Sequence, residues 1–459
     1  MKTSVYQQQA NEAKEKLDSV SPSFCLAKWN QVSLHLPTGM TNSCYHPPLH
    51  KIDASKLDSN PAALHNTKQK LQERQQMLDG KKPAGCSYCW KIEDAGGTSD
   101  RVYRSGEPWA KQDFESIVGK PIDSEWTPRY VEVNFNHACN FKCSYCSPQF
   151  STTWAQEIER YGQYPTSPAH NAPEHFQGSR QPIPNREHNP YVTAFWKWWP
   201  TLYKNLKHFR MTGGEPMMDK NTYKVLDYVI DHPKKDLHLN VTSNMCPPDI
   251  KLKNKYYDKV KRICLDEHVE HFMQFVSVDA FGKQAEYIRN GLDWNYFQDN
   301  VEEFLQRIPV RNSVTFIITY NNLSVTSLDK LLNYIRQLRE RYSTTYQRVW
   351  FDIPLLRQPL WQQITMLPPS YQKIHEDNIS MMQKFQEGVY KDSEYAVFKD
   401  FEIQKMLRNL AYWRKNYDAN AQQKKNFYAF FSEHDRRRGT NFLNTFPEME
   451  EFWKECSAA

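Results

Sequence analysis

An alternation of strand-like and helical segments between residues 129 and 353 is the strongest constraint on the fold of this chain. In the first strand-like segment, Val131, Val133 and Phe135 alternate with other residues, as in a half-buried strand. Six such segments occur, at residues 129–136, 207–212, 236–242, 273–279, 313–319 and 348–353. Helical patterns lie between them, at residues 151–161, 221–231, 250–269, 299–307 and 327–342. Strands that alternate with helices predict parallel βαβ units and the α/β fold class.

The number of repeats limits the architecture. Six β–α repeats are fewer than the eight of a closed (β/α)8 barrel, so we expect an open partial barrel or a doubly wound sheet. Residues 162–195 interrupt the alternation with six prolines. A loop of this length is typical of a lid, or of a disordered or partner-binding insertion. Residues 370–459 have helical patterns rich in Tyr, Phe and Trp.

Composition and charge are those of a folded chain. Hydrophobic residues make up 39% and charged residues 24% of the 459 positions, which allows a packed core and excludes wholesale disorder. The net charge of +6 permits an anionic partner but does not require one. The chain has no run of 18 apolar residues and no apolar stretch at its start, so we expect neither a membrane-spanning helix nor a signal peptide. The sequence therefore predicts a cytoplasmic protein without a membrane partner.

Cysteines are the main functional signal. Seven of the ten fall into two tight patterns, and clustered thiols in a reducing compartment more often bind metal than form disulfides. Cys139, Cys143 and Cys146 form a C-x3-C-x2-C triplet directly after the first predicted strand. Three thiolates on one loop can hold three irons of a [4Fe–4S] cluster and leave the fourth open to a small molecule. A structural zinc loop and unpaired surface thiols are the alternatives, although a closed zinc site needs a fourth ligand nearby.

The triplet, with Tyr145 before its last cysteine, resembles the signature of the radical S-adenosylmethionine (radical SAM) superfamily. The segment MTGGEP at residues 211–216 is similar to the Gly-Gly-Glu-Pro motif of that superfamily. The resemblance covers roughly residues 129–360 and implies a partial (β/α)6 TIM-like barrel. It also implies an oxidoreductase that reductively cleaves SAM at a [4Fe–4S] cluster. The resulting 5′-deoxyadenosyl radical would abstract hydrogen from a substrate, and a flavodoxin or ferredoxin would donate the electron.

The resemblance further implies a set of SAM-binding residues. In the superfamily, the Gly-Gly-Glu-Pro motif meets the SAM amino group, and the end of the third strand, here Thr242 to Asn244, contacts the ribose. Arg289 resembles an arginine that often faces the SAM carboxylate, and Ser277 and Asp279 are similar to the SxD pattern of the family. The residues carried over in this way are Gly213, Gly214, Glu215, Pro216, Thr242, Ser243, Asn244, Ser277, Asp279 and Arg289, with Asn321 and Asn322 as weaker matches. Each is also compatible with an ordinary turn or cap. Their position near the carboxyl ends of predicted strands favours the functional interpretation. No further catalytic residue is predicted.

The second cysteine pattern consists of Cys25, Cys44, Cys86 and Cys89. Gly39, between the first two, suits a hairpin turn that brings Cys25 and Cys44 together, and the C-x2-C pair can supply two more sulfurs. This pattern resembles the opening of SPASM and twitch auxiliary-cluster domains, which implies a second [4Fe–4S] cluster. It departs from most relatives because it precedes the barrel and lacks the further cysteines of a full SPASM domain. Two cysteine pairs are also a zinc-ribbon arrangement, so zinc remains an alternative.

These patterns together predict the domains and the function. We expect a polar tail at residues 1–20, a twitch-like module with its connector at 21–128, the barrel at 129–369 and a helical region at 370–459. Related enzymes with such modules modify peptides or protein side chains, so the resemblance implies a substrate of that class. The alternatives are a small molecule, such as a sugar, nucleoside or cofactor precursor, or a non-catalytic metal- or nucleic-acid-binding protein.

Two other segments have competing interpretations. The aromatic stretch at residues 193–209 carries lysines that would suit base stacking, but it more often forms a helix face packed against its own core. A nucleic-acid partner is therefore not expected. Arg436, Arg437 and Arg438 form either a solvated basic turn or a contact for an acidic peptide or phosphate.

Overall fold

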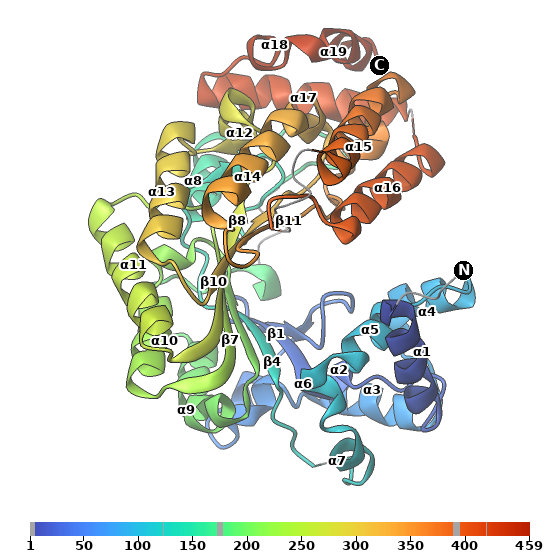
Figure 1. The fold of residues 1–459 in the computed structure, drawn as a ribbon, viewed down its shortest axis with the longest axis vertical. Coiled ribbons are helices and arrows are strands. Elements are labelled where there is room, and N and C mark those ends of the chain that lie inside the picture. Colours follow the sequence, from blue (N-terminus) through green and yellow to red (C-terminus); the bar gives the residue numbers. More distant parts are fainter. Residues whose placement is uncertain (1–4, 123, 172–177, 389–394, 419) are drawn as a thin grey trace. The chain divides into compact units, whose positions relative to one another are not determined.

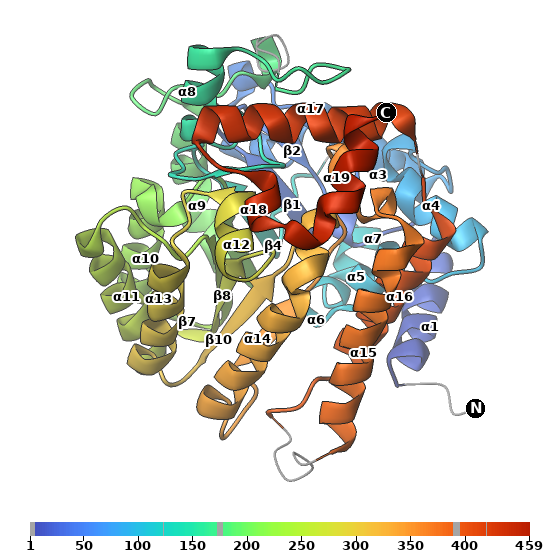
Figure 2. The ribbon, with the colours of Figure 1, turned by 90° about the horizontal axis from the view of Figure 1, so that it is seen from above.

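The structure is a computed structural model that describes residues 5–122, 124–171, 178–388, 395–418 and 420–459 (Figures 1 and 2). It is a mixed α/β fold with many helices and mostly parallel strands, as the sequence predicts. The chain divides into two compact units. The first contains residues 1–136, 181–213 and 236–239, and the second contains residues 137–180, 214–235 and 240–459. The two units are defined by contacts between residues, and each contains segments from several parts of the chain. The domain boundaries predicted from the sequence stay a prediction.

The first unit holds the amino-terminal elements and the first strands of the predicted alternation. Its helices are α1 (Val5–Asp18), α2 (Ala27–Asn30), α3 (Lys68–Leu78), α4 (Ser87–Asp94), α5 (Asp100–Gly106), α6 (Pro108–Lys111), α7 (Phe114–Val118) and α9 (Pro190–Asn205). Its strands are β1 (Gln31–His35), β2 (Met40–Asn42), β3 (His50–Lys51), β4 (Tyr130–Asn134) and β6 (His208–Thr212).

The second unit holds the remaining strands and helices. Its helices are α8 (Thr152–Tyr161), α10 (Lys220–Asp231), α11 (Ile250–Leu265), α12 (Gly282–Ile288), α13 (Trp294–Arg307), α14 (Leu328–Tyr342), α15 (Gln372–Glu387), α16 (Asp400–Lys415), α17 (Ala421–Arg438), α18 (Phe442–Thr445) and α19 (Glu450–Ser457). Its strands are β5 (Lys142–Cys143), β8 (Val269–Ser277), β9 (Arg289–Asn290), β10 (Asn312–Ile317) and β11 (Val349–Asp352). Strand β7 (Lys234–Ser243) has residues in both units.

Strand order in the first unit is β6-β4-β1-β2-β3. Strands β1, β4 and β6 are parallel, and their register places Ser33, Glu132 and Arg210 side by side. Strands β1 and β2 form an antiparallel hairpin, with Gly39 in the turn at a φ of 60°. The hairpin that Gly39 predicts is therefore confirmed. Strands β1 to β3 themselves are absent from the sequence prediction because Gln31 and Ser33 are polar although they are buried.

Strand order in the second unit is β11-β10-β8-β7, and β8, β10 and β11 run parallel. Phe272 and Val276 on one face of β8 are fully buried, whereas Met273 and Phe275 on the other face are partly exposed. One face of β8 is thus packed into the core and the other is partly exposed, whereas β10 is buried on both faces from Asn312 to Phe316. In neither unit do the described strands close into a barrel.

The predicted alternation is confirmed, with shifts at element ends. All six predicted strands form, as β4, β6, β7, β8, β10 and β11, and all five predicted helices form between them. Helix α13 begins at Trp294, earlier than predicted, because the Asp293 side chain accepts a hydrogen bond from the Tyr296 amide and caps the helix. Among the described residues, no helix is long and apolar enough to cross a membrane.

The prediction for the aromatic segment at residues 193–209 is confirmed, whereas that for the arginine run at residues 436–438 is partly wrong. Phe195 and Trp199 of α9 are fully buried, so the core-packing interpretation of residues 193–209 is confirmed. The solvated interpretation of the arginine run is wrong for two of its members: the side chains of Arg437 and Arg438 are 1% exposed, whereas that of Arg436 is 60% exposed. Part of the 162–195 insertion, residues 172–177, lies outside the described residues.

The turn at Gly39 generates a stability prediction. A Cβ at this position would overlap the ring of Tyr191 and would also force a non-glycine residue to a positive φ. We expect Gly39→Ala to destabilise the protein by about 3 kcal/mol, from left-handed strain plus overpacking. Gly80→Ala is the matched control, because Gly80 has a φ of +74° but its nearest neighbour would be 3.9 Å away. Its expected cost is about 1 kcal/mol. Equal urea-unfolding midpoints for the two variants would contradict the packing of Tyr191 on this turn.

Candidate functional site

The cysteine triplet lies on a loop that follows β4 and belongs to the second unit. Strand β5 within this loop pairs with β9 in antiparallel fashion, which sets Cys143 opposite Arg289. The loop is tightly bonded to itself and to α8: the Cys146 amide donates to the Cys143 carbonyl at 2.9 Å, and Trp154 Nε1 donates to the same carbonyl at 2.8 Å. One sequence-distant pairing at Cys143 and several local contacts therefore hold this loop in place.

The three thiols are free and at least half-buried. The Phe141 amide donates to Cys139 Sγ at 3.4 Å, and Arg289 Nη1 donates to Cys143 Sγ at 3.6 Å. Without a bound metal, burial raises the pKa of Cys146 to about 12. N–H donors aimed at sulfur stabilise thiolates once a metal has displaced their protons.

The two glycines of the Gly-Gly-Glu-Pro segment are required by close packing. A Cβ on Gly214 would overlap the carbonyl of Ala138, the residue before Cys139, and the Glu215 amide donates to that same carbonyl at 2.6 Å. Gly213 has a φ of 127°, and a Cβ there would overlap the side chain of Asn134. Gly214 therefore packs directly against Ala138, the residue at which the cysteine loop begins.

Glu215 is a buried carboxylate surrounded by donors. Its side chain accepts hydrogen bonds from the Ser243 hydroxyl at 2.8 Å, the Asn244 amide at 2.7 Å and the Met217 amide at 3.0 Å. Burial raises the pKa of Glu215 to about 7, against the effect of these donors. Ser243 and Asn244, predicted as ribose contacts, therefore orient Glu215 in this structure.

Asn140 joins the end of β7 to the cysteine loop. Asn244 Nδ2 donates to Asn140 Oδ1 at 2.9 Å, and Asn140 Nδ2 donates to the Cys246 carbonyl at 2.7 Å. The residue lies inside the triplet, between Cys139 and Cys143, and its amide both donates and accepts. Sequence reasoning missed it, although a polar residue inside such a short triplet was a usable signal.

Arg289 and Asp279 form a buried ion pair with two hydrogen bonds, of 2.8 and 3.1 Å. Tyr145 joins them: its hydroxyl accepts from Arg289 Nη2 at 2.6 Å and donates to Asp279 Oδ2 at 2.7 Å. The Thr319 amide also donates to Asp279, at 2.8 Å. The arginine predicted to face a SAM carboxylate thus has an internal carboxylate partner, and its remaining contact is with Cys143.

The other predicted residues lie at strand ends or have structural partners. Thr242 and Ser277 lie half-buried at the carboxyl ends of β7 and β8, and Pro216 is buried. The two weaker candidates have structural partners. The Asn321 side chain caps the short helix after β10, and Asn322 Nδ2 donates to the Trp361 carbonyl at 2.9 Å.

The second cysteine pattern forms its own site in the first unit. Cys25, Cys44, Cys86 and Cys89 all line one cavity of about 30 Å³, as predicted from the hairpin and the C-x2-C pair. Three cationic residues and one acidic residue share its lining: Lys28, Arg101, Arg104 and Asp100. Four thiols and an excess of positive charge therefore meet around one buried space.

Donors approach these sulfurs from several elements. Ser105 Oγ donates to Cys25 Sγ at 3.9 Å, and the backbone at His46 and at Arg101 acts to lower the pKa of Cys44 and of Cys89. The buried Lys28 ammonium pairs with Glu73 at 2.6 Å and lies near Cys86. Burial raises the pKa of Cys44 and of Cys89 to about 12 in the metal-free protein.

Neither site has the compact geometry of a single bound ion. Over the described residues, no group of three or more His, Cys, Asp or Glu side chains lies where it could hold one metal ion. Cys246, Cys264 and Cys456 are buried free thiols.

Comparisons with known proteins add little to this geometry. No protein-family model and no curated protein match the chain. Among solved structures, a uronate isomerase from Bacillus halodurans is matched over 97% of this chain and 100% of that one, with 10% identity and a TM-score of 0.23. A likeness at this level carries no argument about the fold or the site.

The raised pKa of Glu215 predicts a pH dependence in the ligand-free protein. Because the fold favours the protonated carboxyl, this contribution to stability is complete below pH 4.5 and is lost as pH rises through about 7. We expect wild type to lose on the order of 2–3 kcal/mol relative to Glu215→Gln between pH 4.5 and 8. Urea unfolding of both proteins across this range measures the difference. Parallel stability profiles would show that Glu215 is not perturbed.

Proposed function

We propose that this protein is a radical SAM enzyme. One observation carries the proposal: the cysteine triplet, Glu215 and the Asp279–Arg289 pair, predicted from separate motifs, belong to one connected arrangement in the second unit. Asn140 and Arg289 provide the connections, through Asn244 and through Cys143 respectively. Motifs that matched by chance would have no reason to converge at the carboxyl ends of strands, where α/β folds place their sites.

The residues present fit a [4Fe–4S] cluster bound to three cysteines. Cys139, Cys143 and Cys146 would each hold one iron, and the fourth iron would be open to SAM. When bound and reduced, the cluster would supply one electron to the SAM sulfonium, whose C–S bond would break to give methionine and a 5′-deoxyadenosyl radical. The protein binds and orients the reactants and excludes water.

The chain's own residues divide this work. Arg289 donates toward Cys143 and so stabilises its thiolate. Glu215, held by Ser243 and Asn244, provides a preoriented carboxylate for an ammonium group. The proposed place of the substrate is beside the face of β8 that carries the partly exposed Met273 and Phe275. The proposed architecture is accordingly the partial (β/α)6 barrel.

The proposal includes a second, closed [4Fe–4S] cluster on Cys25, Cys44, Cys86 and Cys89. Four thiolates leave no open iron, which favours electron transfer or scaffolding over SAM binding. Tetrahedral zinc, with Zn–S bonds of about 2.3 Å, needs its four sulfurs within about 3.8 Å of one another. A [4Fe–4S] cluster binds each thiolate at a different iron and therefore accepts larger distances between the four sulfurs. The cations that line this cavity would offset the negative charge of such a cluster.

The proposed substrate is a peptide or a protein side chain. This choice of substrate rests on the resemblance between the amino-terminal cysteine pattern and the auxiliary modules of peptide-modifying enzymes. A flavodoxin or ferredoxin is the proposed electron donor. A small-molecule substrate is the alternative within the same chemistry, and a non-catalytic metal-binding protein is the alternative outside it.

The test of the function is SAM cleavage after anaerobic reconstitution. With a strong reductant, wild type is expected to form 5′-deoxyadenosine, and Cys143→Ala to form at least about a hundredfold less, because two thiolates hold the cluster poorly. Cys264→Ala is the control, since Cys264 is a buried free thiol outside both patterns. Wild type that carries a full cluster but forms no 5′-deoxyadenosine would refute the enzymatic proposal.

The metal in the first unit is tested in a variant that lacks Cys139, Cys143 and Cys146. We expect about four irons and matching sulfide to remain in this triple variant, bound by the four other patterned cysteines. One zinc and no iron would replace the second cluster with a structural zinc site. Neither metal would mean that these four cysteines are not a metal site.

A further inference from the structure

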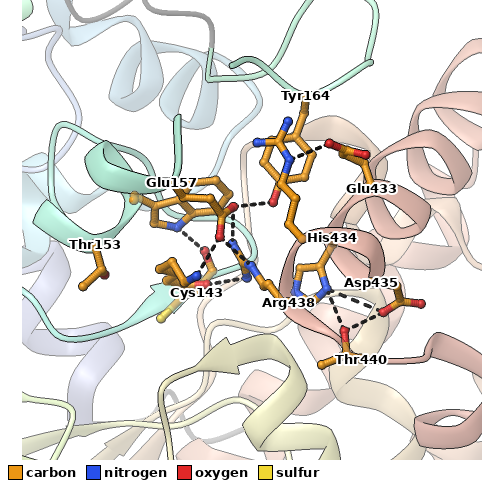
Figure 3. A network of polar contacts seen from close by, with 12 residues as sticks. Cys143, Thr153, Glu157, Tyr164, Glu433, His434, Asp435, Arg438 and Thr440 are labelled. Carbon is orange, nitrogen blue, oxygen red and sulfur yellow. Dashed lines mark hydrogen bonds and ion pairs between the residues drawn. The ribbon is translucent and has the colours of Figure 1, made fainter. Parts of the chain in front are cut away.

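The end of α17 makes contacts with the cysteine loop that the proposed chemistry does not use. Figure 3 shows Arg438 reaching from this helix toward Glu157 and the backbone at Cys143. Arg438 Nη1 donates to the Lys142 carbonyl, next to Cys143, at 2.8 Å. Its Nε and Nη2 donate to the two carboxylate oxygens of Glu157, each at 3.1 Å. One planar guanidinium thus binds a loop carbonyl and a helix side chain together.

Glu157 of α8 is the centre of this group. Besides Arg438, its carboxylate pairs with the Lys142 ammonium at 2.7 Å and accepts from the Tyr164 hydroxyl at 2.6 Å. The side chains of Arg438 and Glu157 are 1% and 2% exposed. Removing Glu157 would leave the buried Arg438 guanidinium without its carboxylate, which is strongly destabilising, whereas Glu157 would keep Lys142 if Arg438 were lost.

Aromatic packing and a neighbouring arginine complete the arrangement. Arg438 lies over the Trp154 ring, with 4.7 Å between guanidinium carbon and ring centroid, and Trp154 donates to the Cys143 carbonyl. Arg437 donates to the carbonyls of Gly162 at 2.9 Å and Gln163 at 3.1 Å. The same helix end therefore fixes the cysteine loop and the start of the insertion.

We infer that Arg438, held in register by Glu157, is a positioning residue that fixes the place of Cys143 through the Lys142 carbonyl. The inference concerns the loop itself, and its role in cluster binding rests on the proposed function. The bidentate pair orients the guanidinium, and the remaining Nη1 then sets the loop backbone. Lysine at this position would keep the charge but not the fork that binds both groups.

The experiment measures cysteine accessibility in the metal-free protein, so it does not depend on a cluster. Iodoacetamide labelling, followed residue by residue by mass spectrometry, compares Cys143 with the buried Cys264 as an internal reference. We expect Arg438→Ala to raise the rate at Cys143 by about tenfold relative to Cys264, because local opening becomes easier. The labelling rate of Cys143 in Arg438→Lys is expected to lie between those of wild type and Arg438→Ala. Glu157→Gln is expected to raise this rate as well.

Arg436→Ala is the matched control. Arg436 is exposed and pairs with Glu433 at 2.7 Å, so its loss should leave labelling of Cys143 unchanged. If Arg438→Ala unfolds the protein, seen as equal labelling of Cys143 and Cys264, then Glu157→Gln and Arg438→Lys decide. Folded variants that label Cys143 at the wild-type rate overturn the inference.

A second readout separates this inference from the proposed function. In reconstituted protein, Arg438→Ala is expected to lose triplet iron to a chelator about tenfold faster and to change the EPR spectrum of the reduced cluster. The Arg436→Ala spectrum should match wild type. One outcome is that Arg438→Ala labels Cys143 faster than wild type does, relative to Cys264, although neither protein binds iron. This outcome would support Arg438 as a positioning residue and refute the cluster. Full iron binding with unchanged labelling, chelation and spectrum would do the reverse.

Discussion

The buried carboxylate of Glu215 is the group on which the candidate site most depends. It receives donors from Met217, Ser243 and Asn244, while its own amide donates to the Ala138 carbonyl at the entry to the cysteine loop. A carboxylate in so dry a place is costly unless these donors are kept. Glycine at position 214 follows from this geometry, since any side chain there would separate Glu215 from the loop.

The sequence was sufficient for the elements whose residue pattern matches their burial. The strand with Val131 and Val133, which are both fully buried, is found where expected. Strand β1 was missed because Gln31 and Ser33 are buried on a strand that reads as polar. Tertiary packing decided that assignment, and five residues carry too little pattern to reveal it.

The site shows the same division. Local motifs identified both sets of cysteines and Glu215, because their spacing is itself the signal. They did not reveal what the polar residues do: Ser243 and Asn244 hold Glu215, and Arg289 pairs with Asp279. Arg438 was beyond reach, because its contact with Lys142 joins positions 296 residues apart, and a run of three arginines is usually solvated.

The distance in sequence between Lys142 and Arg438 has a consequence for biosynthesis. At about 5–20 residues per second, a ribosome needs roughly 15–60 s after making the cysteine loop before it adds this arginine. Throughout that time the three thiols lack the helix that fixes their backbone. Under the proposed function, iron delivered during translation would meet a loop that is not yet fixed, and stable cluster loading would follow the docking of α17. A ribosome that stalls within this interval would leave reactive, unsupported cysteines exposed to oxidation.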